Sequence, residues 1–144
     1  MRQELQEAKK SQELDYLDLL HTKFKYGGTS IEEGFDCFTL ASEMARRRGI
    51  VIPNVNKQKI PVSKASIMFA DTYNKELFRE VPKGKNVLVL MKNPFGQISH
   101  IGFMIDSNNF IHMTGEYGCL ITKTSDATYK KRIVGYYLPK DYNP

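Results

Sequence analysis

The 144-residue sequence has no tryptophan, only two cysteines and three histidines, and no apolar run that approaches the roughly 18 residues of a membrane span. Two cysteines cannot form the disulfide framework of a small secreted protein, and no Cys/His cluster has zinc-ligand spacing. The N-terminal segment is rich in acidic residues and lacks the apolar centre of a signal peptide. We therefore expect synthesis in the cytoplasm, no membrane contact, and no metal ion or other cofactor.

The composition is typical of one globular domain. A hydrophobic fraction of 41% with 11% aromatic residues excludes a disordered chain. No repeat or Gly/Ser linker divides the sequence, so we expect a single domain over residues 1–144. The net charge of +5 fits an anionic partner such as a cell-wall polymer or nucleic acid, although such a charge more often reflects only a solvated basic surface. Because no phosphate-binding loop or RNA-binding aromatic motif is present, we expect no nucleic-acid partner.

The apolar spacing in the first half of the chain predicts helices over residues 4–22, 37–48 and 65–80. The middle helix has the strongest start signal, because Asp36 is a favourable N-cap and Phe35 can pack on Leu40 as a hydrophobic staple. Gly49 is a plausible stop. In this interpretation Cys37 is the first helical residue.

The second half of the chain has a different pattern, with short alternating segments separated by turn residues. These segments predict strands over residues 86–92, 98–105, 110–113, 119–123 and 132–138. Helices followed by a meander of strands predict an α+β domain, in which N-terminal helices pack on an antiparallel sheet.

Cys37 and two histidines are the candidates for chemistry. A thiol in the first turn of a helix meets unpaired N–H groups and the positive end of the helix dipole, which favour thiolate over the ordinary pKa of about 8.5. His100 and His112 lie in successive predicted strands, so the chain order matches nucleophile, base and base-orienting group. A packing role is commoner for any one of them alone. We expect Cys119 to be a core residue, and nothing in the sequence favours a disulfide between it and Cys37.

Three blocks of sequence resemble the NlpC/P60 cysteine peptidases. Residues 24–30 (Phe-Lys-Tyr-Gly-Gly-Thr-Ser) and 34–37 (Gly-Phe-Asp-Cys) resemble the family's "Y-x-W-G-G-T-S … G-F-D-C-S-G-L" motif. Residues 99–103 (Ser-His-Ile-Gly-Phe) resemble its "s-H-V-G-I-Y" strand, and residues 110–113 (Phe-Ile-His-Met) its "F-I-H-A" strand. The blocks occur in order and with family-like spacing. The resemblance implies a papain-like α+β fold and hydrolysis of amide bonds, most often in the peptide stems of bacterial peptidoglycan.

Carried over to this chain, the resemblance implies that Cys37 is the nucleophile, His100 the general base and acid, and His112 the polar group that orients His100. A thiolate would attack the amide carbon, and an imidazole, whose unperturbed pKa is about 6.5, can protonate the departing amine. The Cys37 backbone N–H, at the start of the helix, is placed to stabilise the oxyanion that develops.

The chain departs from the motif around the nucleophile. Phe24 stands where the family has a tyrosine whose hydroxyl is associated with substrate or oxyanion binding, and Tyr26 stands at the tryptophan position. Phe38 and Thr39 replace Ser and Gly after the cysteine. Asp36 keeps the acidic residue that helps many members to hold the free amino terminus of a stem peptide. We therefore expect an intact triad and altered substrate contacts, with Asp36, Tyr26 and Phe24 as the substrate-binding candidates.

The leading expectation is a cysteine endopeptidase or amidase acting on peptidoglycan peptide. Without a signal peptide or wall-binding repeats, a bacteriophage tail or lysis component, with tail proteins as partners, is favoured over a secreted housekeeping hydrolase. Two alternatives stay open. One is a catalytically silent phage-tail or peptide-binding module, and the other is a related thiol hydrolase acting on another acyl substrate.

The triad also makes a geometric prediction, because His112 can orient His100 only from the same face of the sheet. A two-residue turn at residues 107–108 would put the two side chains on opposite faces. A five-residue loop would pair Met104 with Phe110 and leave the histidines as same-face diagonal neighbours. We therefore predict an odd-length loop or a bulge, with one His112 nitrogen within hydrogen-bond reach of the His100 ring.

Overall fold

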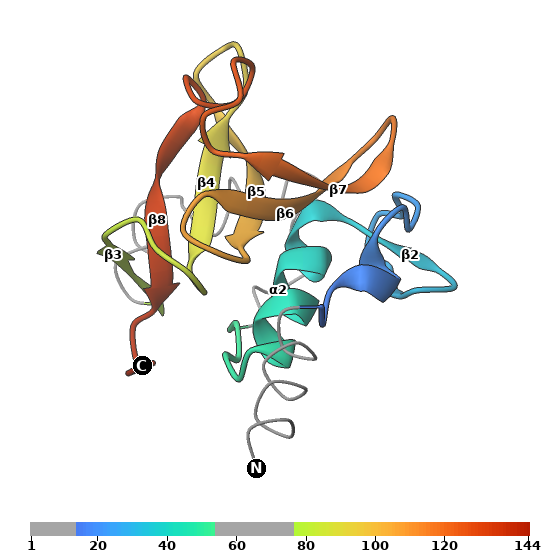
Figure 1. Cartoon of the computed structure of the whole chain (residues 1–144), viewed down its shortest axis with the longest axis horizontal. Coiled ribbons are helices and arrows are strands. Elements are labelled where there is room, and N and C mark those ends of the chain that lie inside the picture. The colour runs from blue at the N-terminus through green and yellow to red at the C-terminus, as the bar shows by residue number, and fades with distance from the viewer. Residues whose placement is uncertain (1–13, 54–76) are drawn as a thin grey trace, which may run out of the picture.

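The computed structural model describes residues 14–53 and 77–144. In chain order, the elements are the 3-10 helix η1 (Leu17–Leu19), strands β1 (Thr29–Ser30) and β2 (Gly34–Phe35), helix α2 (Cys37–Arg47), and strands β3 (Phe78–Val81), β4 (Leu88–Lys92), β5 (Ile98–Met104), β6 (Asn109–Thr114), β7 (Gly118–Lys123) and β8 (Ile133–Pro139). Strands β3 to β8 form one antiparallel sheet in the order β3-β8-β4-β5-β6-β7, and β1 pairs with β2 (Figure 1). The predicted α+β class and antiparallel sheet are confirmed.

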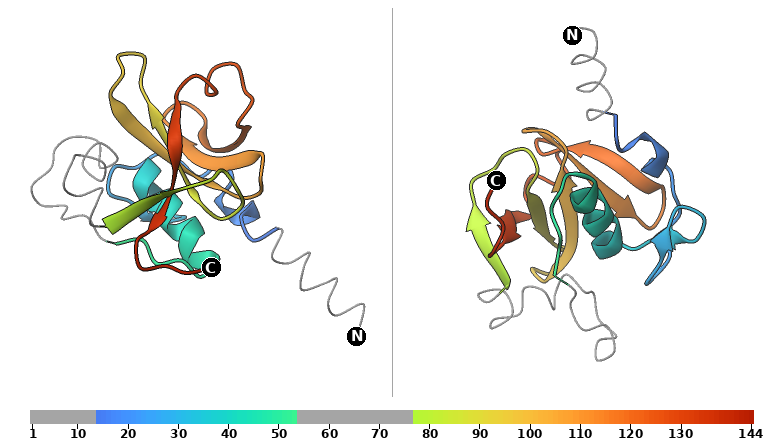
Figure 2. Two further views of the ribbon diagram at one scale, coloured as in Figure 1. Left: turned by 90° about the vertical axis from the view of Figure 1, so that its left-hand side faces the viewer. Right: turned by 90° about the horizontal axis from the view of Figure 1, so that it is seen from below.

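Helix α2 packs against β5 and β6, as the views in Figures 1 and 2 show. It contributes to the hydrophobic core a buried face made of Phe38, Leu40, Ala41, Met44 and Ala45. None of the helices in the described part of the chain has the length and apolarity that crossing a membrane would need.

The start of α2 is fixed by local hydrogen bonds, as the sequence predicts. The Asp36 carboxylate accepts from the Thr39 N–H at 2.8 Å, and the Thr39 hydroxyl accepts from the Asp36 N–H at 2.9 Å. This reciprocal capping box satisfies two groups at the helix start and gives Thr39 a structural role at the motif's glycine position. At the other end Gly49 adopts a left-handed φ of 81°, which ends the helix.

The C-terminal end of α2 is tied to distant parts of the chain through Arg48. Its guanidinium forms an ion pair with Asp15, with Nε 2.7 Å from Oδ2, and also donates to the Asn86 side chain at 2.6 Å and to the Ile105 carbonyl at 3.3 Å. The Arg48 side chain is only 8% exposed. These contacts tie the C-terminal end of the helix to the segment before η1 and to the loops that flank the sheet.

The predictions for the first and third helices are wrong at the ends that the structure describes. Between residues 14 and 22 the first segment forms only η1 and does not continue as a helix, because His21 turns to a φ of 66° and its N–H donates to the Cys119 carbonyl of β7 at 2.9 Å. The segment predicted to be helical to residue 80 forms β3, which pairs with β8 through residues 78–81. In both places pairing with a distant strand overrides the local periodicity. Residues 4–13 and 65–76 of these predictions lie outside the described residues.

The five predicted strands are confirmed to within two residues at each end. The turn between β5 and β6 sets the site geometry. Met104 pairs with Phe110 and Phe103 with Ile111, and the Ile105 N–H donates to the Asn109 carbonyl at 3.0 Å. This is the register of a five-residue loop, so the odd-length connection predicted from the triad is confirmed.

Candidate active site

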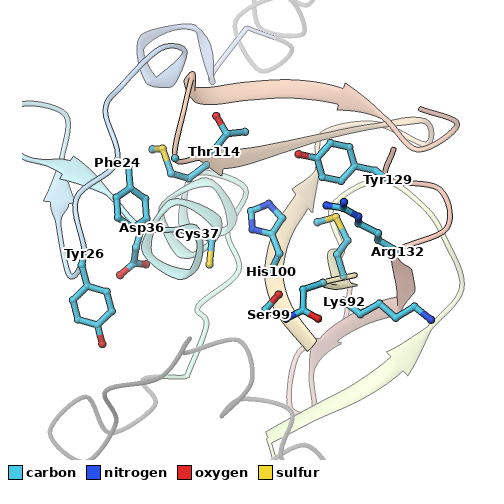
Figure 3. Close-up of a pocket in the computed structure, with 14 residues that line it drawn as sticks. Phe24, Tyr26, Asp36, Cys37, Lys92, Ser99, His100, Thr114, Tyr129 and Arg132 are labelled. Carbon is cyan, nitrogen blue, oxygen red and sulfur yellow. The ribbon is translucent and has the colours of Figure 1, made fainter. Parts of the chain in front are cut away.

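A pocket of about 420 Å³ opens between the start of α2 and the sheet (Figure 3). Its wall combines the loop before β1, the first residue of α2, the ends of β4, β5 and β6, and the segment that precedes β8. Five of the six predicted site residues line it, namely Phe24, Tyr26, Asp36, Cys37 and His100. The sixth, His112, lies behind His100. The fold therefore brings together residues that are spread over 89 positions of sequence, from 24 to 112.

Cys37 is the first residue of α2 and its side chain is half-buried in this pocket. Burial, followed by the neighbouring Asp36 carboxylate, raises the pKa of the Cys37 thiol to about 11, although the backbone N–H groups of Ile101, Phe38 and Cys37 itself act to lower it. The expectation that the helix start yields a free thiolate is therefore wrong for the resting protein. Since the Ile101 N–H is among these groups, the sulfur lies beside β5, the strand that also carries His100.

The two histidines form a hydrogen-bonded pair. His100 Nε2 lies 2.8 Å from His112 Nδ1, and the two ring planes meet at 71°. The predicted hydrogen bond is thus confirmed. His112 Nε2 in turn lies 2.8 Å from the Thr122 hydroxyl, which extends the chain to three side chains on β5, β6 and β7.

Burial lowers the pKa of both imidazoles. The pKa of His100 falls to about 4, with the charge of Arg132 as the second cause, and the pKa of His112 falls to about 3, with His100 as the second cause. His112 is 1% exposed. Both values lie below the unperturbed imidazole pKa of about 6.5, because burial disfavours the charged ring. At neutral pH the site holds a neutral thiol and two neutral imidazoles.

The substrate-binding candidates lie on the Cys37 side of the pocket. The Asp36 carboxylate is 4% exposed and, besides capping α2, accepts from the Gly27 N–H at 2.9 Å. It thereby holds the loop of Tyr26 over the start of the helix. Phe24 is 49% exposed and forms an isolated bridge with Phe35, whereas the Tyr26 ring is 55% exposed and points away from Cys37 (Figure 3).

Sequence reasoning missed the residues on the other side of His100. The Tyr129 ring packs edge-on against the His112 ring, with centroids 5.0 Å apart, and the Arg132 guanidinium lies 5.8 Å from the centroid of the Tyr129 ring. Both residues line the pocket. The sequence signal for them is weak, namely a basic cluster, Tyr-Lys-Lys-Arg, that precedes the last strand.

Thr122 was also missed, although the same-face argument that pairs the histidines would have found it. In the β6–β7 register Thr122 lies opposite Phe110 and Leu120 lies opposite His112. Thr122 is therefore a same-face diagonal neighbour of His112, just as His112 is of His100. Nowhere in the described residues do three His, Cys, Asp or Glu side chains gather as a metal site would require.

Three solved structures with similar folds are NlpC/P60 proteins or domains. A protein similar to a lipoprotein of the NLP/P60 family from Staphylococcus aureus Mu50 superposes with a TM-score of 0.57 at 17% identity, covering 89% of this chain and 39% of that one. An NlpC/P60 family protein from Bacillus cereus gives 0.52 at 22% identity, covering 82% of this chain and 35% of that one. The NlpC/p60 domain of the peptidoglycan hydrolase SagA gives 0.51 at 14% identity, covering 89% and 92%.

This chain thus spans less than half of the two larger structures and nearly all of the SagA domain. At these identities the structures support the fold alone. No curated protein matches the sequence significantly. The model of the NlpC/P60 family, however, matches residues 21–137, which is most of the chain and includes every residue of the pocket described above. The chain therefore belongs to the NlpC/P60 family.

Proposed function

We propose that the protein is a cysteine endopeptidase or amidase that hydrolyses amide bonds in the peptide stems of bacterial peptidoglycan. The observation that carries the proposal is the 2.8 Å contact between His100 and His112 in the wall of a pocket that also holds Cys37. Membership of a family that generally comprises cysteine peptidases and amidases supports it, as does the fold shared with a domain of a peptidoglycan hydrolase.

In this proposal the proton of Cys37 moves during attack rather than before it, because thiol and imidazole both rest in their neutral forms. Cys37 Sγ attacks the carbonyl carbon while His100 Nδ1 takes the thiol proton. The Cys37 backbone N–H, at the positive end of α2, stabilises the oxyanion. Collapse of the tetrahedral adduct breaks the C–N bond, and His100 returns the proton to the amine. Water then hydrolyses the thioester with His100 again acting as base, which restores the thiol.

His112 is the positioning residue of this mechanism. For His100 Nδ1 to accept a proton, His100 Nε2 must carry one and donate it to His112 Nδ1. His112 must then carry its own proton on Nε2 and donate it to the Thr122 hydroxyl, 2.8 Å away. This assignment follows from the catalytic requirement, since the distances alone fit either tautomer. The Thr122 hydroxyl can accept this bond, so it supports the tautomer that leaves His100 free to act as base.

The substrate contacts on the Cys37 side also follow from residue chemistry. Asp36 supplies a carboxylate beside the nucleophile, and each carboxylate oxygen can accept more than one hydrogen bond, so a substrate amino group can bind there. Phe24 has no hydroxyl and offers only an apolar surface. Tyr26 lies at the rim of the pocket. The tyrosine hydroxyl that the family motif provides is therefore not replaced at this position.

A second candidate function is a catalytically silent module that grips peptide. The raised pKa of Cys37 and the phenylalanine at position 24 favour it, since a neutral thiol is a weak nucleophile. Delivery as a phage tail or lysis component, with tail proteins as partners, stays a prediction from the sequence. Hydrolysis of a different acyl substrate by the same thiol is distinguished by the experiment below.

The test is digestion of purified peptidoglycan with mass analysis of the released fragments, using the wild-type chain and Cys37→Ala in parallel. We expect fragments with one new amino terminus from the wild type and none from the variant. Labelling with a thiol-reactive probe at neutral pH separates the enzyme from the silent module, because only a base-assisted thiol should react faster than a free cysteine. An intact wall together with a labelled Cys37 would indicate a thiol enzyme for another substrate.

A further inference from the structure

Arg132 differs from the other arginines of the described chain. The guanidiniums of Arg46, Arg47, Arg48 and Arg79 each donate to a carboxylate or a carbonyl. The Arg132 side chain makes no hydrogen bond or ion pair with any described residue, and its guanidinium lies over the face of the Tyr129 ring, 5.8 Å from the centroid. It is nevertheless half-buried and lines the pocket beside His100. A half-buried cation without an anion in a binding pocket indicates where an anionic ligand is accommodated.

The position of Arg132 gives the pocket two ends of opposite charge. Figure 3 shows His100 between Cys37 and Arg132, with Asp36 on the far side of Cys37. The carboxylate of Asp36 and the guanidinium of Arg132 therefore lie on opposite sides of the reacting groups. The Lys92 N–H donates to the Arg132 carbonyl at 2.8 Å, so a second cationic residue adjoins the same end, although its side chain is exposed and extends away from His100.

An unpaired Arg132 also has a chemical consequence for His100. After burial, which is the larger cause, the charge of Arg132 further lowers the pKa of His100 and so disfavours its protonated form. The proposed mechanism nevertheless passes through a protonated His100 each time the thiol is deprotonated. An anion bound to Arg132 would offset this repulsion at the step where it matters. A guanidinium also presents two parallel N–H groups, which match the two oxygens of a carboxylate.

We infer that Arg132 is the anchor of a subsite for a substrate carboxylate that lies close to the hydrolysed amide, on the His100 side of the pocket. The inference deepens the proposed function and rests on it, because the proposed function is what identifies the substrate as an acidic peptide. Stem peptides carry such groups, both as the α-carboxyl of a γ-linked D-glutamate and as a C-terminal carboxyl. The competing explanation is that Arg132 only covers the Tyr129 ring.

The test measures binding by calorimetry, with the full chain carrying Cys37→Ala so that no turnover occurs. The probe is the tripeptide L-Ala-γ-D-Glu-L-Lys in three forms: with both carboxyls free, with the D-glutamate α-carboxyl replaced by a carboxamide, and with the C-terminal carboxyl replaced by a carboxamide. The comparison distinguishes the two sources of the carboxylate. We expect one of the two replacements to weaken binding about tenfold, the effect of a lost charge-assisted hydrogen bond in a partly buried site.

Adding Arg132→Gln should abolish that difference and leave the affinity for the matching carboxamide peptide unchanged, which a purely structural role would not do. Arg132→Lys should keep part of the preference. Lys131→Gln is the matched control, because it removes the same charge from the adjacent exposed residue, which does not line the pocket. It should keep the full preference.

Equal affinities for the three peptides, no binding of any of them, or a preference that survives Arg132→Gln would each overturn the inference. Because the measurement needs no turnover, it is independent of the digestion experiment. A protein that binds the carboxylate through Arg132 but does not hydrolyse peptidoglycan would contradict the proposed enzyme and retain the subsite.

Discussion

Replacing Thr122 by valine isolates the last hydrogen bond of the chain that leads from His100. Valine has nearly the shape of threonine, so the change removes the hydroxyl and little else. His112 is 1% exposed and its Nε2 lies 2.8 Å from that hydroxyl, so its Nε2–H would be left buried without a partner. Such a group costs about 1–3 kcal/mol. The free energy of unfolding should fall by up to this amount.

The buried imidazole can avoid an unpaired N–H by moving its proton to Nδ1, which leaves Nε2 as a bare ring nitrogen. His112 would then donate to His100 Nε2, and the remaining proton of His100 would sit on Nδ1, where it blocks acceptance of the Cys37 proton. If the productive tautomer is disfavoured by the same 1–3 kcal/mol, kcat should fall by about five- to 150-fold, with KM nearly unchanged. Thr122→Ser keeps a hydroxyl and should retain most of the activity.

The assay is steady-state hydrolysis of a stem peptide by the wild type and both variants, with thermal unfolding measured on the same samples. A Thr122→Val protein that loses stability but keeps the wild-type kcat would show that the Thr122 hydroxyl is not needed to hold the productive tautomer. Equal losses of kcat in the serine and valine variants would likewise refute the reasoning, since only valine lacks the hydroxyl.

Other perturbations test the rest of the site and the fold. The pH profile of kcat/KM should be a broad plateau from about pH 4 to about pH 11, because His100 becomes protonated below this range and the Cys37 thiol ionises above it. A bell-shaped profile centred near neutral pH would contradict the neutral resting forms of Cys37 and His100. The free energy of unfolding, from denaturant titrations, should fall as the pH drops below about 6.5, because the unfolded chain then binds protons that the buried imidazoles, with their lowered pKa values, still exclude. Arg48→Ala should cost about 3 kcal/mol in denaturant titrations by leaving Asp15 unpaired, with kcat retained in the folded protein; an unchanged unfolding midpoint would contradict this. Cys119→Ala should lose about 1 kcal/mol of packing and keep full activity, and loss of activity in the folded variant would show that Cys119 has a further role.

The parts of the site that could be predicted from the sequence are those fixed over short distances along the chain. Asp36 and Thr39 cap α2 through bonds that span three residues, so the place of Cys37 at the helix start follows from local chemistry. The pairing of His100 with His112 follows from strand alternation together with the requirement that both rings share a face.

The parts that could not be predicted depend on pairing between distant strands. Residues 78–81 form β3 because they pair with β8, which lies more than fifty residues later in the chain. The helix η1 ends before His21, whose N–H donates to β7. Arg132 and Tyr129 reach the pocket because the segment between β7 and β8 folds back beside β4. No local sequence pattern predicts that path. The pKa values of Cys37 and His100 were missed for the same reason, since burial is a property of the assembled fold.

The central claim is that Cys37 and His100 act together as nucleophile and base. The most direct test compares kcat/KM for the wild type, Cys37→Ala and His100→Ala on a stem peptide identified by wall digestion, with folding of each variant checked by thermal unfolding. The account predicts that both variants fall to the background rate while remaining folded. Retention by either folded variant of more than a few per cent of wild-type activity would contradict it.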